Sequence, residues 1–137
     1  MLQVLPIQSK EAQAALCARC ALPYDPDCLA YEATVDGTSA GVCQFRINDK
    51  GGFIYGLASV DDASLSAQAR AEAIFVMGRA ALNFMDLCGV RDAYFADAHF
   101  ADEAMIRAIG FRRREDGAWH MDVAGFFTSS PCQYDNR

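Results

Sequence analysis

The sequence is poor in lysine and has no excess of positive charge. Lys10 and Lys50 are the two lysines among 12 basic residues, and 18 acidic residues leave a net charge of −6 and a pI near 4.7. Proteins that bind nucleic acids normally present a basic surface, so this composition argues against a DNA- or RNA-binding function. An acidic surface is compatible with cationic or amine ligands, although solubility alone also favours it.

Long apolar runs are also missing. Runs such as Ala73–Met77 are far shorter than the roughly 20 apolar residues that a membrane helix needs. No basic segment followed by an apolar stretch opens the sequence, so we expect a cytoplasmic protein with no signal peptide and no membrane association. The 137 residues, of which 53% are hydrophobic, are enough for one domain with a sizeable core. We place this domain at residues 1–124, followed by a C-terminal tail at residues 125–137.

The six cysteines follow no disulfide or zinc-finger spacing. Reduced and mostly buried thiols are therefore expected, and no metal site is predicted. The alternative is a zinc site built on the pair Cys17 and Cys20 together with Cys28 and Cys132. A structural zinc site usually has two close pairs of ligands, whereas this sequence has one.

Alternation, capping and turn signals predict seven strands and three helices in the order β-α-β-β-β-α-β-α-β-β. A crossover helix between two strands forces those strands to run parallel, whereas the hairpins are antiparallel. The sequence therefore predicts an α/β (α+β) fold with a mixed sheet of about seven strands and one parallel pair inside it. The expected elements are a strand at 2–7, a helix at 9–20, strands at 29–35, 41–47 and 53–60, a helix at 66–88, a strand at 91–97, a helix at 101–109, and strands at 111–115 and 118–123.

Three finer expectations follow from the same patterns. The strand Phe53–Val60 is nearly uncharged, which predicts that both of its faces are covered. Glu103 and Arg107 have the i, i+4 spacing of a helical ion pair. Around the turn at Asp116-Gly117, Arg113 is expected to face His120 across the final hairpin, with Trp119 beside them.

This element order resembles the GNAT superfamily of N-acetyltransferases over residues 2–123. Leu57-Ala-Ser-Val60, before the long helix, is similar to the family's fourth strand. His99-x-x-Asp102-x-x-x-Ile106-x-x-x-Gly110-Phe111 is similar to its next helix and Gly-Phe ending. The resemblance implies that the fourth and fifth strands diverge and that acetyl-CoA lies in the opening, where an amine attacks the thioester.

The resemblance also implies which residues hold the coenzyme. The pantetheine arm would bind the strand backbone at Leu57, Ala58, Ser59 and Val60, and the pyrophosphate would lie at the N-terminus of the following helix. The family's phosphate loop reads Gln/Arg-x-x-Gly-x-Gly/Ala, and the nearest match supplies Gln68, Arg70, Ala71 and Ala73. Alanine here replaces the first glycine, and Glu72 adds a negative charge. The alternative is that residues 64–71 are only the capped first turn of a helix.

The residues for proton transfer depart from the family's pattern. The tyrosine that many members use as an acid falls at Ile106, and an asparagine seven residues earlier falls at His99. His99 is a candidate acid-base group, or else a capping or surface histidine. Tyr55 is the one ionisable side chain in the strand Phe53–Val60 and the candidate base, or else a core tyrosine.

Two functions are consistent with these patterns. The first is a GNAT-like N-acyltransferase that transfers an acyl group from acetyl-CoA to a small-molecule or peptide amine. The second is a catalytically degenerate GNAT-fold binding or dimerisation module. Phe126-Phe127 in the tail could form a homodimer interface or fold back on the sheet. No pattern in the loop Pro23–Cys28 or in the final hairpin identifies the amine.

Overall fold

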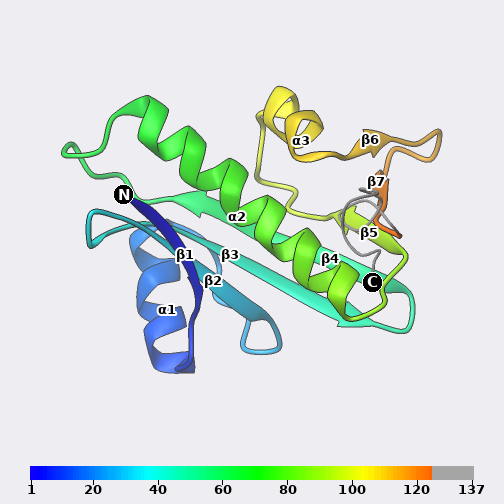
Figure 1. Cartoon of the computed structure of the whole chain (residues 1–137), viewed down its shortest axis with the longest axis horizontal. Coiled ribbons are helices and arrows are strands. Elements are labelled where there is room, and N and C mark those ends of the chain that lie inside the picture. Colours follow the sequence, from blue (N-terminus) through cyan, green and yellow to red (C-terminus); the bar gives the residue numbers. More distant parts are fainter. Residues whose placement is uncertain (125–137) are drawn as a thin grey trace, which may run out of the picture.

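The elements lie in the predicted order in the computed structural model, which describes residues 1–124 (Figure 1). The tail, with its predicted Phe126-Phe127 interface, lies outside the described residues. No helix within residues 1–124 is long and apolar enough to span a membrane. The elements are β1 Leu2–Pro6, α1 Lys10–Arg19, β2 Leu29–Val35, β3 Thr38–Asn48, β4 Gly51–Ser59, α2 Ala67–Leu87, β5 Asp92–Phe95, α3 Glu103–Ile109, β6 Arg112–Arg113 and β7 Trp119–Asp122.

The strands form one mixed sheet of seven strands in the order β1-β2-β3-β4-β5-β7-β6. β4 and β5 are parallel, and every other neighbouring pair is antiparallel. This confirms the predicted fold class and the parallel pair inside the sheet. The pair arises because α2 carries the chain from the end of β4 back to the start of β5, as Figure 1 shows.

The helices cover opposite faces of the sheet. Gln44 of β3 accepts a hydrogen bond from Gln13 of α1, whereas the next residue, Phe45, contacts Phe84 of α2. Because neighbouring residues of a strand point to opposite faces, α1 and α2 lie on different sides. α3 lies on the α2 side, where Gly78 lets Ile109 approach closely: a Cβ at this glycine would be 2.8 Å from the Ile109 Cδ1.

The long helix α2 begins and ends where its capping residues predict. Ser66 Oγ accepts the Ala69 N–H at 3.0 Å, and Gly89 adopts a positive φ of 83° directly after the C-cap. The face of α2 that packs on the sheet is buried, whereas Cys88, the C-cap residue, is exposed. The buried residues of the helix are Ala73, Ile74, Met77, Gly78, Ala81, Leu82 and Met85.

The finer expectations need three corrections. Residues of β4 alternate between buried and half-buried up to Gly56, so the face on the α1 side is only partly covered. In the final hairpin Arg113 lies opposite Trp119, one residue out of the predicted register. Glu103 pairs with Arg113 at 2.9 Å rather than with Arg107, because both arginines pack over the Trp119 ring and Arg113 also reaches α3.

Candidate functional site

β4 and β5 separate soon after they meet. They are paired over three positions, from Gly52 opposite Ala93 to Ile54 opposite Phe95. The last bond between them is donated by the Ala96 N–H to the Ile54 carbonyl at 2.8 Å. Beyond this point β4 continues to Ser59 beside β3 alone, while the other chain turns away toward α3. An opening is therefore left on the β5 side of β4, as the resemblance implied.

A β-bulge at Tyr55 changes which residues of β4 face this opening. Gln44 lies opposite Gly56, but the next residue of β3, Phe45, lies opposite Ile54, so Tyr55 is an extra residue. A bulge places two successive side chains on one face. Tyr55 and Gly56 both face the α1 side, where Leu22 packs against Gly56, whereas Leu57 faces α2.

The backbone of β4 presents hydrogen-bonding groups to the opening. The Val60 N–H bonds to the Ala40 carbonyl at 2.8 Å, so the peptide groups of Ala58 also point toward β3. By alternation, the peptide groups of Leu57 and Ser59 point the other way, toward the opening. The Leu57 N–H donates to Asp97 Oδ2 at 3.1 Å. The groups of Ser59 and the Leu57 carbonyl form an edge that an extended ligand can pair with.

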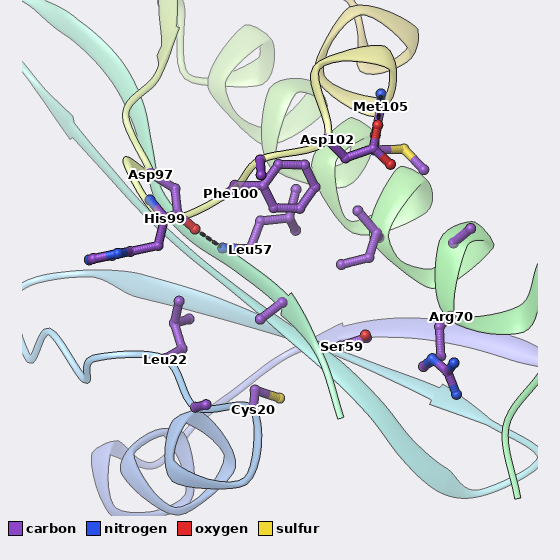
Figure 2. A pocket seen from close by; sticks show the side chains of 15 residues that line it. Cys20, Leu22, Leu57, Ser59, Arg70, Asp97, His99, Phe100, Asp102 and Met105 are labelled. Atoms are coloured by element: carbon purple, nitrogen blue, oxygen red, sulfur yellow. Dashed lines mark hydrogen bonds between the residues drawn. The ribbon is translucent and has the colours of Figure 1, made fainter. Parts of the chain in front are cut away.

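The opening leads into a cavity of about 420 Å³, which we call the splay cavity. Figure 2 shows Asp97 and His99 at one end of it and Arg70 at the other, with Ser59 between them. Phe100 and Met105 close the α3 side, and Leu22 lies on the α1 side. The full lining is Cys20, Ala21, Leu22, Leu57, Ala58, Ser59, Arg70, Ala71, Ile74, Asp97, His99, Phe100, Ala101, Asp102 and Met105.

Six of the ten predicted site residues line this cavity: Leu57, Ala58, Ser59, Arg70, Ala71 and His99. The other four, Tyr55, Val60, Gln68 and Ala73, do not. Tyr55 lies on the other face of the sheet, and Gln68 is exposed on α2. Val60 is 2% exposed and Ala73 is 0% exposed, so both side chains belong to the core. The predicted role of Val60 lies in its backbone, whose N–H donates to the Ala40 carbonyl of β3.

The predicted phosphate loop is helical. α2 begins at Ala67, so Gln68, Arg70, Ala71 and Ala73 all lie in its first two turns, as the capped-helix alternative proposed. The loop that precedes the helix carries Asp61 and Asp62 rather than glycines. The pKa of Asp62 is held below its usual value, mainly because its carboxylate accepts the Ser64 N–H at 2.8 Å.

Arg70 is the one arginine or lysine that lines the splay cavity. Its guanidinium donates to the Leu65 carbonyl at 2.7 Å and approaches the Asp62 carbonyl at 3.5 Å. These bonds hold the cation beside the first turn of α2, where the helix dipole is also positive. An anionic group at this end would therefore meet Arg70 and the first turns of α2, whereas Asp61 and Asp62 of the preceding loop do not line the cavity.

The position that would carry a tyrosine acid faces elsewhere. Ile106 is 2% exposed and lines a separate cavity between α3 and Trp119 rather than the splay cavity. The α3 residue that reaches the splay cavity is Met105, which cannot donate a proton. The ring of His99 is exposed at the far end and is directed away from Phe100 in Figure 2.

Asp97 is the central polar residue of the site, although the sequence did not place it among the candidate site residues. It is 8% exposed, and its Oδ1 accepts the His99 N–H at 3.0 Å while Oδ2 holds the Leu57 N–H. It lines the splay cavity, the cavity beside Ile106 and a third cavity on the α1 side. The available signal was a carboxylate two residues after a buried strand, at the end where parallel strands commonly place functional groups.

The third cavity, which we call the loop cavity, has a volume of about 400 Å³ and meets the splay cavity at Leu22, Asp97 and His99. Tyr55 lines it, together with the loop that follows α1. The full lining is Leu22, Pro23, Tyr24, Asp25, Pro26, Gln44, Tyr55, Ala96, Asp97, Ala98 and His99.

A buried amide network fixes the loop beside this cavity. Gln13 and Gln44 are each 1% exposed, and Gln13 Nε2 donates to Gln44 Oε1 at 2.8 Å. Gln44 Oε1 also accepts the Asp25 N–H at 3.0 Å, and its Nε2 donates to the Pro23 carbonyl at 2.9 Å. Because buried polar groups must be paired, this network sets the position of the loop relative to α1 and β3.

The cysteines near the site are protonated thiols with little reactivity. Burial, with a smaller contribution from Cys17, raises the pKa of Cys20 to about 11. Burial and then Asp25 raise the pKa of Cys28 to about 12. Cys17, Cys20 and Cys28 are free cysteines, and Cys132 lies outside the described residues. Within residues 1–124, no three histidine, cysteine or acidic side chains are grouped so that they could hold a metal ion.

Comparison with solved structures gives the fold a family context. The chain resembles the ribosomal-protein-S18-alanine N-acetyltransferase of Escherichia coli with a TM-score of 0.63 and 14% identity, over 90% of this chain and 95% of that one. It resembles YhhK of Escherichia coli, a candidate N-acetyltransferase solved with coenzyme A, with a TM-score of 0.55 and 16% identity, over 89% and 98%. It also resembles a candidate acetyltransferase of the GNAT family from Desulfovibrio desulfuricans, with a TM-score of 0.62 and 13% identity, over 90% of this chain and 100% of that one.

These likenesses establish the fold: the chain has the GNAT fold, over about nine-tenths of its length. The sequence itself matches no family model and no curated protein. At identities of 13% to 16% the comparisons do not extend to activity or substrate.

Proposed function

We propose that this protein is an N-acetyltransferase that binds acetyl-CoA in the splay cavity and transfers the acetyl group to an amine. The observation that carries the proposal is the divergence of β4 and β5 beyond Ile54, which opens a cavity between a strand edge and the first turns of a long helix. The structural likeness to YhhK, which was solved with coenzyme A, supports the same assignment.

The residues present fit the coenzyme at two points. The peptide groups of Ser59 and the Leu57 carbonyl would pair with the amides of the pantetheine arm, as an added strand would. Arg70 and the first turn of α2 would hold the phosphates, with Ala71 beside them. Bound there, acetyl-CoA supplies the acetyl group as a thioester. His99, at the opposite end, is our candidate for transferring a proton near the sulfur.

Specific observations also favour the second candidate, a GNAT-fold module without efficient catalysis. The Leu57 N–H, which faces the opening, is already occupied by Asp97. Asp61 and Asp62 lie in the loop before α2, where negative charge opposes phosphates. Ile106, in place of a tyrosine acid, faces away from the cavity.

Thermal unfolding with acetyl-CoA and with coenzyme A tests both candidates. A ligand at about 100 times its dissociation constant stabilises a protein by about 2.7 kcal/mol, which is several degrees for a domain of this size. We expect both ligands to raise the melting temperature, and mass spectrometry to detect an N-acetyl product with an amine acceptor. No shift with either ligand would overturn the enzyme proposal, and a shift without transfer to any amine would favour the module.

A further inference from the structure

We propose that the loop cavity is the acceptor site, that it admits a small primary amine carried on an uncharged apolar or aromatic group, and that Asp97 accepts the proton of its ammonium. This inference rests on the proposed acetyl transfer and deepens it by naming the acceptor class. Three features of the described residues carry it: the charge of the lining, the position of Asp97 and the apolar and aromatic side chains, Tyr55 among them, that make up most of the lining.

The charges around the loop cavity select against anionic acceptors. Asp25 and Asp97 contribute two carboxylates to its lining, which includes no lysine or arginine. Arg46 and Lys10 are cations that lie near the cavity without lining it: Arg46 is over the Tyr55 ring and 3.6 Å from Asp27, and Lys10 donates to the Cys28 carbonyl. A protonated amine therefore enters a site of favourable potential, whereas the carboxylate of an acidic or zwitterionic amine would meet like charge.

Asp97 is placed to receive the amine where the two cavities join. Each of its oxygens accepts one backbone N–H, from His99 at 3.0 Å and from Leu57 at 3.1 Å. An ionised carboxylate has about four acceptor positions, so further positions remain for an ammonium donor. Because Asp97 is 8% exposed and fixed by both bonds, its contact with an ammonium would be shielded from water and well oriented.

Apart from Gln44 and His99, the remaining lining is apolar or aromatic. The Tyr55 ring is held by stacking on Phe53, with centroids 5.7 Å apart, and by the Arg46 guanidinium, which lies over the ring at 4.7 Å, so the rest of the ring is what a ligand can contact. Tyr24, two prolines, Leu22 and two alanines complete the apolar part of the lining. A polyamine would place additional charges against these surfaces, which favours an acceptor with a single amine on an apolar frame. The volume of about 400 Å³ suits a small molecule.

The transfer step balances with these groups. The ammonium gives one proton to Asp97, and the freed nitrogen lone pair forms the C–N bond to the thioester carbonyl carbon. The C–S bond breaks, and the sulfur leaves with its electron pair. A second N–H proton passes to that sulfur through His99 or water, and Asp97 returns its own proton to solvent through the open loop cavity. The products are an amide, a free thiol and one proton.

The test compares single acceptors with acetyl-CoA and the full chain, with mass spectrometry measuring the N-acetyl product. The probes are 2-phenylethylamine, spermidine, glutamate, a tripeptide with a free N-terminus, and aniline, which is uncharged at neutral pH. We expect 2-phenylethylamine to give the highest kcat/KM among the charged acceptors. A higher kcat/KM for spermidine, glutamate or the tripeptide would overturn the assigned acceptor class.

Asp97→Asn separates a chemical role from a structural one. The variant keeps the shape of the side chain but can accept only one of the two backbone N–H bonds, so part of its effect is structural. General-base catalysis is worth about 100-fold or more, so we expect at least that loss in kcat/KM with 2-phenylethylamine. With aniline, which carries no ammonium proton, the loss should be under about tenfold, because the base is not needed to free the lone pair. Equal losses with both acceptors would mean that Asp97 only supports the fold of the site, and would overturn its assigned role.

Tyr55→Ala tests whether the acceptor contacts the Tyr55 side chain in the loop cavity. We expect the KM for 2-phenylethylamine to rise about fivefold to tenfold, the size of one aromatic contact, and Tyr55→Phe to recover most of that loss. An unchanged KM in Tyr55→Ala would place the acceptor outside the loop cavity. If acetyl-CoA stabilises the protein but none of the amines is acetylated, the acceptor assignment is wrong while coenzyme binding stands. If acetyl-CoA does not stabilise the protein and no amine is acetylated, the proposed acetyltransferase function itself is wrong.

Discussion

The splay cavity and the loop cavity meet at Asp97 but depend on different features of the fold. The splay cavity lies where the sheet topology leaves a strand edge at Leu57 and Ser59 beside the first turns of α2. The loop cavity is made of side chains and of a loop held by two buried glutamines. The first follows from the topology, which proteins at 14% identity can share, whereas the second depends on residue identities that such likenesses do not report.

Ala71→Glu should break the splay cavity most strongly. Ala71 lines it at the start of α2 and is exposed, so the longer side chain fits without disturbing the core. A carboxylate beside the coenzyme phosphates juxtaposes like charges, which costs several kcal/mol, so we expect about 100-fold weaker binding of acetyl-CoA by calorimetry. Asn83→Glu, on an exposed part of the same helix far from the cavity, is the control. Equal affinities for the two variants would mean that the phosphates lie elsewhere.

Gln44→Leu should affect the loop cavity and spare the splay cavity. The substitution leaves Gln13 Nε2, the Asp25 N–H and the Pro23 carbonyl without this partner. Unpaired buried groups cost about 1–3 kcal/mol each, and because the loop can relax we expect a total loss of about 2 kcal/mol in urea unfolding. The KM of the amine should rise while acetyl-CoA still stabilises the variant. Gln8→Leu, at an exposed glutamine, controls for the change of residue type, and a comparable loss there would contradict the network's role.

Cys20 gives the smallest expected effect, through the dependence of stability on pH. Its folded pKa of about 11 lies above the ordinary value of 9.0, so the folded state keeps a proton that the unfolded state loses. The resulting stability is fully present below pH 9.0 and is lost as the pH rises toward about 11. Cys20→Ala should reduce this loss by about 1 kcal/mol, below the full linkage value because the thiol borders an open cavity. Parallel stability curves for the two proteins across that range would contradict the shift.

The sequence predicted the elements that local signals encode. Ser66 and Gly89 mark the ends of α2, and the crossover through α2 requires β4 and β5 to be parallel. The register of the final hairpin was harder to predict from the sequence. Arg113 lies opposite Trp119, and Arg107 and Arg113 both pack on the Trp119 ring, a contact that the turn residues do not specify. Glu103 forms its ion pair with Arg113 rather than with Arg107 because Arg113, which packs on the same ring, also reaches α3.

The part of the cavity lining that could be predicted is the part whose place follows from topology. Leu57, Ala58 and Ser59 line the splay cavity because of their place in β4, and Arg70, Ala71 and His99 line it because α2 begins and β5 ends beside the same opening. Tyr55 was placed with them, but the bulge turned it to the other face, and a bulge leaves little trace in a pattern of half-buried residues. The sequence did not identify Asp97 as a site residue, because its position where three cavities meet depends on the folded structure and not on a motif in the chain.

The extra residue at Tyr55 also bears on how this stretch can change length over evolution. Loss of that residue would leave Ile54 opposite Phe45 and Leu57 opposite Cys43, so the ladder with β3 would become regular and Leu57 would keep its face. A β4 shorter by one residue would therefore keep its place beside the splay cavity and lose only the tyrosine that lines the loop cavity. Descendants of this chain should differ in the lining of the loop cavity before they differ in the register of the sheet.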